Sequence, residues 1–180
     1  MPDILVVNPL ETTNWNDLLV QTAGHSFFHT AQWAKVLTAA YNYQPLYMCG
    51  NHNSGPADLL PLMEVKSMLT GKRGVCLPFT DFCEPLAANA ESFKALLDKA
   101  LELGHGRRWK YLEIRGGATY LERMPSSGVY WGHELDLRPG HDRLLSLMRD
   151  STRRNLKKAS AKGVEINVST SLDAMKKFCR

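Results

Sequence analysis

A run of basic residues at positions 149–158 is the feature of this sequence best suited to binding chemistry. On a helix, four of its cations occupy positions i, i+1, i+4 and i+5 and share one side: Arg153, Arg154, Lys157 and Lys158. Four fixed cations suit a diphosphate, a nucleotide or an RNA backbone. A solvated basic face without a ligand is the alternative interpretation.

The charge of the whole chain points to the same region. The net charge is +4 at pH 7. Residues 141–180 hold ten Lys/Arg and four Asp/Glu, whereas residues 1–140 hold twelve and fourteen. The basic character therefore belongs to the C-terminal end of the sequence. No aromatic residues are interleaved with the basic run, so stacking of single-stranded bases is not indicated.

A second candidate is Lys35, which follows Trp33 on an expected helix and lies outside the apolar stripe of that helix. A single exposed lysine that only aids solubility is the alternative. A third candidate is the loop at 77–86, which carries two carboxylates at the end of an expected strand. Asp81 or Glu84 could act as a general base if partly buried. No neighbouring His or Lys completes a dyad, and a purely structural loop is the alternative.

Several kinds of site are not supported by the sequence. The four cysteines form no CxxC pair and predict free, mostly buried thiols in a reducing compartment. His25 and His29 are four residues apart, but Gly24 and Ser26 indicate a loop, so we expect no metal. Residues 21–26 look like the pyrophosphate loop of acetyltransferases, yet they follow a helix instead of a strand. No P-loop, G-x-G-x-x-G or G-x-S-x-G motif is present, and no Ser/His/Asp set is evident.

Hydrophobic periodicity predicts alternating strands and helices that must position these residues. We expect strands at 4–8, 46–49, 59–68, 75–79, 109–114, 129–137 and 164–168. We expect helices at 14–23, after a Thr30 cap, at 91–103 and at 142–162, with another beginning at 171. The helix after Thr30 carries an apolar stripe of Trp33, Val36, Leu37, Ala40 and Tyr41. Turns are expected at 51–56 and 70–74, and glycines 104 and 106 are expected to end the third helix.

This pattern favours an α/β fold with a mixed, largely antiparallel sheet flanked by helices. The hairpin expected over 59–79 argues against a strictly parallel βαβ fold. No apolar run approaches the length of a membrane span, and residues 1–3 do not open a secretory signal. We therefore expect a cytoplasmic location.

Three segments together resemble the Fem family, whose members add amino acids to peptidoglycan precursors and whose relatives carry a GNAT-type acetyltransferase fold. They are TAQWAKV at 30–36, LPFTD at 77–81, and STRRNLKKA at 151–159 followed by KGV at 162–164. The resemblance implies a GNAT-like, acyl-CoA N-acyltransferase-like sandwich. It further implies one lobe over 1–170, with 171–180 starting a connecting helix toward a second lobe that this chain lacks.

What the resemblance implies about function is an acceptor-binding half of a two-lobed acyl or aminoacyl transferase, inactive without the second lobe. The acceptor would be an amine of a cell-wall or polysaccharide-type precursor bearing a diphosphate, either a small molecule or lipid-linked. Trp33, Lys35 and the cations of the basic run would hold it. This half would carry no cofactor; acyl-CoA or aminoacyl-tRNA would be the donor of the complete enzyme, with tRNA reached through the second lobe.

Two alternatives remain from the sequence. One is a stand-alone binding module that uses the basic helix for RNA or an acidic partner, which steep salt dependence would reveal. The other is a small GNAT N-acetyltransferase, against which the missing pyrophosphate loop argues. Protection by acetyl-CoA against thermal unfolding would favour it.

Overall fold

The computed structural model describes residues 3–50, 58–80, 83–122, 124, 126–133 and 135–179. Contacts within the chain divide it into unit 1, Met1–Pro125, and unit 2, Ser126–Arg180. The turn expected at 51–56 lies outside the described residues.

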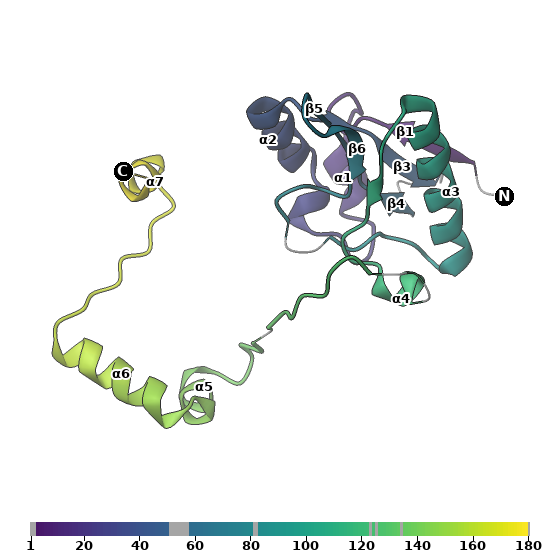
Figure 1. Ribbon diagram of the computed structural model, residues 1–180. Coiled ribbons are helices and arrows are strands. Elements are labelled where there is room, and N and C mark those ends of the chain that lie inside the picture. The colour runs from purple at the N-terminus through teal and green to yellow at the C-terminus, as the bar shows by residue number, and fades with distance from the viewer. Residues whose placement is uncertain are drawn as a thin grey trace. The chain divides into compact units, whose positions relative to one another are not determined.

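The strands that the described residues form belong to unit 1 and are shown in Figure 1. They are β1 (Ile4–Val7), β2 (Gln44–Pro45), β3 (Tyr47–Gly50), β4 (Leu59–Leu60), β5 (Met63–Ser67), β6 (Gly71–Val75) and β7 (Leu112–Glu113). The helices of this unit are α1 (Trp15–Leu19), the 3₁₀ turn η1 (Phe27–His29), α2 (Ala31–Tyr41), α3 (Ala90–Arg107) and α4 (Ala118–Leu121). In Figure 1, α2 and α3 flank the strands of the unit.

The strands form two sheets, ordered β1-β3-β4 and β2-β5-β6-β7. Pro45 pairs with Met63 in one sheet, and Met48 pairs with Leu60 in the other. The two antiparallel pairings therefore continue one another along the chain without a change of register. The Leu46 amide donates to the Leu62 carbonyl at 2.8 Å between them. Pro61 interrupts the ladder because proline has no amide hydrogen to donate. The strand expected at 59–68 is therefore present, but it is divided at this proline.

The hairpin expected after this strand is confirmed, but its turn is placed differently. β5 and β6 pair from Met63 opposite Val75 to Ser67 opposite Gly71. The expected turn at 70–74 is wrong, because residues 71–75 form the second strand and the connection is 68–70. The glycines at 71 and 74 suggested a turn, whereas Gly74 lies inside β6 against an aromatic ring.

Helix α3 connects β6 to β7, and these two strands are parallel. The helix continues through Gly104 and Gly106 and ends at Arg107, so the prediction that these glycines end it is wrong. Gly104 has a packing role: a Cβ there would lie 2.8 Å from Cε3 of Trp109. A Cβ on Gly74 would collide with the same ring. Both glycines admit Trp109 between helix and sheet.

The core of unit 1 lies between these helices and strands, with Tyr47, Leu59, Leu62 and Leu96 fully buried. Helix α2 contributes Ala34 and Leu37 to it. The predicted stripe of α2 is therefore only partly right. Trp33 and Leu37 do face inward, but the other three members, Val36, Ala40 and Tyr41, are exposed. The small residues Ala34 and Thr38 take their place on the inner face. Helix α1 is shorter than the expected 14–23.

A buried carboxylate joins β5 to the end of α3 and to Trp109. The side chain of Glu64 on β5 is fully buried. It accepts hydrogen bonds from Arg107 Nε at 2.6 Å and Trp109 Nε1 at 2.7 Å, and Lys66 Nζ lies 3.4 Å away. Burial alone would raise the pKa of Glu64, but these donors outweigh it and lower the pKa to about 2.

Unit 2 contains α5 (His141–Leu147), α6 (Asp150–Ala161) and α7 (Leu172–Phe178). The single helix expected at 142–162 is divided, because Met148 and Arg149 have extended backbone with ψ near 149° and 147°. Asp150, Ser151 and Thr152 then provide the polar residues that favour a new helix start. The helix expected to begin at 171 is present as α7, and Ser171 caps it by accepting a hydrogen bond from the Ala174 amide.

The strands expected at 129–137 and 164–168 are not formed by the described residues there. Their alternating apolar side chains are exposed, including Trp131 and Ile166. A strand needs a neighbour to satisfy its backbone groups, and no described strand pairs with either segment.

The fold-class prediction of an α/β fold with mixed, largely antiparallel pairing flanked by helices is nonetheless confirmed, with the strands divided between two sheets. No helix among the described residues combines the length and the apolar character that a membrane crossing requires.

Replacing Gly104 or Gly106 of α3 by alanine should change the free energy of unfolding in opposite directions. Gly106→Ala should raise the free energy of unfolding by about 0.5–1 kcal/mol, since no atom lies within 4 Å of the new Cβ. Gly104→Ala should lower it by about 1–3 kcal/mol because the Cβ collides with Trp109. Urea unfolding of both variants measures the difference, and equal effects would contradict the packing role of Gly104.

The pKa of Glu64 predicts a specific acid dependence of stability. Because folding lowers this pKa, the stabilisation is complete above the ordinary value of 4.5 and is lost as pH falls toward about 2. It amounts to about 3 kcal/mol at neutral pH. Glu64→Gln should therefore destabilise the protein and flatten the curve of unfolding free energy against pH between these values.

The matched control for this experiment is Glu102→Gln, which removes an exposed carboxylate 2.9 Å from Lys99. It should change stability by less than about 0.5 kcal/mol. Guanidinium unfolding at a series of pH values gives all three curves, and parallel curves for wild type and Glu64→Gln would refute the assignment.

Candidate functional site

Helix α6 presents the predicted basic face, defined by Arg153, Arg154, Lys157 and Lys158. All four residues are exposed. Arg153 forms an ion pair with Asp150, one turn earlier on the same helix. Within the described part of the chain, no ion pair engages the other three cations. The basic face therefore has charge available for an anionic ligand, because an exposed ion pair to one residue is weak.

Lys35 lies on the exposed side of α2, as predicted, and lines a hollow of about 470 Å³. The other wall comes from the first turn of α1, including Asn16 and Asp17, and from the segment that leads into it. Asn16 holds the two walls together, because its amide donates to Gln32 Oε1 at 2.8 Å and its oxygen accepts from the Ala31 amide at 3.0 Å. Lys35 therefore projects at the edge of a fixed concavity.

Trp33 does not line the hollow of Lys35. Its ring packs edge-on against Phe27 and Phe28, with centroids 5.9 and 5.4 Å away. Its Nε1 is buried without a hydrogen-bond partner among the described residues. The structure thus separates the two members of the predicted pair: Lys35 faces a hollow, whereas Trp33 belongs to an aromatic cluster.

The predicted carboxylates of the 77–86 loop have different outcomes. Asp81 lies outside the described residues. Glu84 is half-buried, and its Oε2 accepts a hydrogen bond from the Gly117 amide at 2.7 Å. This contact fixes the backbone at Gly117, which has a positive φ of 72°. A role of Glu84 as general base stays a prediction, with one carboxylate oxygen already engaged.

A buried polar cluster around His29 was not predicted from the sequence. His29 Nδ1 accepts from the Ser26 amide at 3.1 Å, and Nε2 donates to the Glu84 carbonyl at 3.0 Å. The ring is therefore neutral, and desolvation lowers its pKa. Cys83 Sγ lies 3.5 Å from Nε2. The signal in the sequence was Ser26 three residues before His29, which is the spacing of a side-chain cap.

This cluster is structural and does not contain an activated nucleophile. The hydrogen bond with Cys76 and then burial raise the pKa of the Cys83 thiol. Burial raises the pKa of Cys49 to about 12. A thiolate is the reactive form of cysteine, so neither residue is poised for nucleophilic attack. Among the described residues, no three His, Cys, Asp or Glu side chains form a group that could hold a metal ion.

Three aromatic rings form a parallel stack on the surface of unit 1. Tyr41 lies 4.5 Å from Phe79 and 5.4 Å from Tyr43 between ring centroids, and the planes differ by at most 27°. Phe79 is 56% exposed and has a φ of 64°. A bulky residue in this left-handed region is strained, and such strain often accompanies binding sites. Sequence reasoning assigned Tyr41 to the core and so missed this stack.

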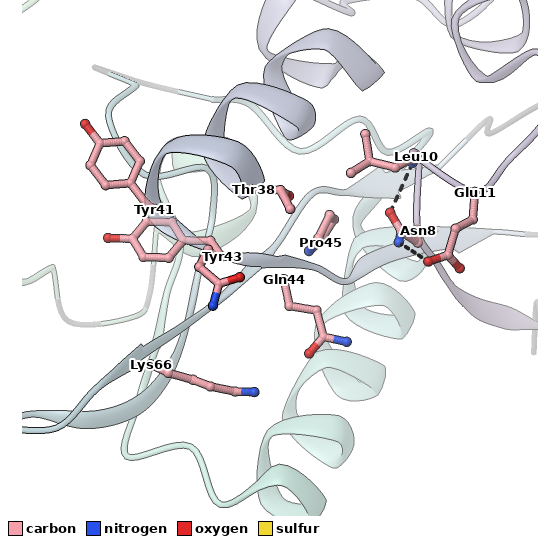
Figure 2. A pocket seen from close by; sticks show the side chains of 10 residues that line it. Asn8, Leu10, Glu11, Thr38, Tyr41, Tyr43, Gln44, Pro45 and Lys66 are labelled. Atoms are coloured by element: carbon pink, nitrogen blue, oxygen red, sulfur yellow. Dashed lines mark hydrogen bonds between the residues drawn. The ribbon is translucent and has the colours of Figure 1, made fainter.

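The ring stack borders a second hollow, of about 490 Å³. Figure 2 shows Tyr41 and Tyr43 at one end and Asn8 and Glu11 at the other, with Gln44 between them. Thr38 also lines it, and its hydroxyl is buried without a hydrogen-bond partner in the described part of the chain. The hollow thus combines aromatic rings and side-chain amides with two opposite charges, those of Glu11 and Lys66, so its lining does not favour a phosphate.

No protein-family model matches the chain. No curated protein matches it either. Similar solved structures include a ribosomal-protein-alanine N-acetyltransferase from Brucella melitensis biovar Abortus 2308, at 13% identity and a TM-score of 0.47, covering 74% of this chain and 97% of that one.

Two further structures are similar at the same level. A predicted acetyltransferase from Clostridium acetobutylicum, solved with acetyl-CoA, has 11% identity and a TM-score of 0.44, covering 78% of this chain and 99% of that one. An acetyltransferase from Trypanosoma brucei has 12% identity and a TM-score of 0.45, covering 76% and 100%. All three are described as acetyltransferases. All three TM-scores lie below 0.5.

The burial of the thiols predicts their reactivity. Cys49, Cys76 and Cys83 are buried and Cys179 is exposed. When the native protein is treated with an aromatic disulfide reagent, only Cys179 should react and release the coloured thiolate. The other three cysteines should react only after denaturation. Cys179→Ser should abolish the native reaction. Rapid reaction of Cys83 in the folded protein would instead make the His29 cluster a candidate nucleophilic site.

Proposed function

We propose that this chain is the acceptor-binding half of a two-lobed, Fem-like acyl or aminoacyl transferase. The observation that carries the proposal is the basic face of α6, whose four cations are exposed and engaged by one described ion pair. An exposed cluster of fixed cations favours binding of a multivalent anion over any proton-transfer chemistry. The anion we assign to it is the diphosphate of the acceptor substrate.

The two kinds of cation have different roles in this proposal. The guanidinium groups of Arg153 and Arg154 can each donate two parallel hydrogen bonds to phosphate oxygens, which sets the orientation of the diphosphate. Lys157 and Lys158 follow one turn later and act as point charges that add affinity. Lys35 belongs to unit 1 and is assigned a separate contact to the acceptor, supported by its position at a fixed hollow. Trp33 supports the helix that carries Lys35.

The reaction that fits this role is attack of an acceptor amine on a thioester or an aminoacyl ester. The amine forms the new amide bond, the thiol or hydroxyl of the donor leaves, and the amine loses a proton. This chain would contribute by holding the acceptor, since positioning alone can accelerate such a step strongly. Handling of the donor, acyl-CoA or aminoacyl-tRNA, is assigned to a second lobe. A cell-wall or polysaccharide-type precursor is the proposed acceptor.

The extent of the lobe is part of the same proposal. A single GNAT-like lobe over residues 1–170, followed by a connecting helix, would place α7 (Leu172–Phe178) at the start of the connection. The capped start of this helix at Ser171 agrees with a new element beginning there.

Titration with uridine diphosphate tests the anchoring role. Arg154→Gln/Lys157→Gln should weaken binding about tenfold or more, because two charge-assisted contacts are lost. Lys176→Gln/Lys177→Gln is the matched control, since it removes the same charge from exposed cations of α7. Isothermal titration calorimetry gives both affinities. If both double variants lose the same affinity for uridine diphosphate, the effect comes from net charge alone, which would contradict a specific diphosphate site on α6.

The same titration separates this function from RNA binding. Diphosphate binding through α6 should be retained at physiological salt, whereas an RNA backbone held by several cations loses affinity steeply with ionic strength. Tight, strongly salt-dependent binding of unrelated oligonucleotides, without diphosphate binding, would favour the binding-module alternative.

A further inference from the structure

The hairpin of β5 and β6 ends in two large apolar side chains that no part of the described chain covers. Met68 is 104% exposed and Leu69 is 94% exposed. The turn that presents them is held by its own polar groups. Ser67 Oγ accepts from the amides of Leu69 and Thr70 at 3.3 and 3.2 Å, and Arg73 donates to Thr70 Oγ1 at 2.6 Å. The apolar pair therefore projects from a structured turn.

Cations surround the base of this tip. The sequence from 66 to 73 holds Lys66, Lys72 and Arg73 and no acidic residue. Lys66 and Lys72 are paired directly across the hairpin. Like charges at such positions repel each other, so a counter-charge from outside would relieve them. Glu64 lies 3.4 Å from Lys66, but its carboxylate is buried and also bound by Arg107.

A fourth cation joins the group from the neighbouring strand segment. The Lys110 amide donates to the Lys72 carbonyl at 2.9 Å, which places the two residues side by side. The Lys110 side chain lies over Gly71, where an added Cβ would meet its Cε at 2.8 Å. The hairpin tip thus consists of an apolar pair, Met68 and Leu69, above a collar of Lys66, Lys72, Arg73 and Lys110.

From this arrangement we infer that the hairpin tip docks on an anionic lipid surface. Met68 and Leu69 enter the boundary between headgroups and acyl chains, and the collar contacts anionic headgroups. An apolar pair combined with adjacent cations is the composition that favours interfacial binding to anionic membranes. The cations beside the apolar pair complement the charge of an anionic bilayer, and this charge complementarity favours a bilayer as the occupant. The inference goes beyond the proposed function and uses none of the residues of α6.

Co-sedimentation of the protein with vesicles tests this inference. Wild type should bind vesicles of phosphatidylcholine mixed with phosphatidylglycerol, should bind pure phosphatidylcholine much more weakly, and should lose binding as salt is raised. Met68→Ser/Leu69→Ser should weaken partitioning on the mixed vesicles more than tenfold. Lys72→Gln/Lys110→Gln should weaken it about 25-fold at low salt, since each cation near the surface contributes about fivefold.

Matched controls separate the tip from general properties of the chain. Ile166→Ser/Val168→Ser removes an apolar pair that is 87% and 92% exposed in unit 2. Lys176→Gln/Lys177→Gln removes the same charge elsewhere. Both should leave vesicle binding unchanged, and all variants should keep the circular dichroism and melting temperature of wild type because the altered side chains are exposed.

Three outcomes would overturn the inference. The first is equal vesicle binding by wild type and Met68→Ser/Leu69→Ser. The second is a dimer, seen by sedimentation velocity, that the tip variant dissociates while wild type ignores vesicles; the tip would then cover a second copy of this chain. The third is binding of oligonucleotides through the collar without vesicle binding. Diphosphate titration needs no vesicles, so failure of the docking inference leaves the proposed function independently testable.

Discussion

The buried carboxylate of Glu64 is the interaction on which unit 1 depends. It receives donors from the end of α3 and from Trp109, which precedes β7, and Arg107 also donates to Gln44 of β2 at 2.7 Å. Through Arg107, the carboxylate of Glu64 thus links β5 and β2 to α3, the helix that connects β6 to β7. Removing one partner would leave a charge or a donor unsatisfied in the interior, which costs far more than an exposed pair. The ring of Trp109 also packs between α3 and β6 at this point, because Gly74 and Gly104 leave room for it.

Much of this fold could be predicted from the sequence, because local signals and burial agree in unit 1. Thr30 caps α2 and Asn89 caps α3 by accepting backbone hydrogen bonds, and the β5–β6 hairpin follows its apolar pattern. Predictions failed where a glycine had a packing role, as at Gly104. They also failed in unit 2, where residues 129–137 and 164–168 have the alternation of strands but pair with no described strand. Alternation specifies which face is apolar, but it cannot supply a neighbouring strand.

The candidate site could be predicted only in part, because several of its contacts join residues that are far apart in the sequence. The exposure of Arg154, Lys157 and Lys35 agrees with their charge, but periodicity does not explain it, since apolar Leu156 of α6 and Val36 of α2 are exposed as well. The hydrogen bonds of His29 reach Glu84, 55 residues later, and no local pattern indicates that contact. The stack of Tyr41 and Phe79 is likewise nonlocal, and apolar periodicity placed Tyr41 in the core instead. Long-range contacts of this kind become visible only once the sheet brings the two segments together.

The left-handed backbone of Phe79 has an evolutionary consequence for the ring stack. Glycine would relieve the backbone strain at this position but would remove the ring that Tyr41 contacts. Losing Tyr41 would in turn remove the stacking that offsets the strain. Neither residue can therefore drift by itself without a loss, and the fitness effects of substitutions at the two positions should be epistatic. Exposed residues ordinarily tolerate substitution one at a time. Tyr41 and Phe79 are instead expected to be substituted together, if they are substituted at all.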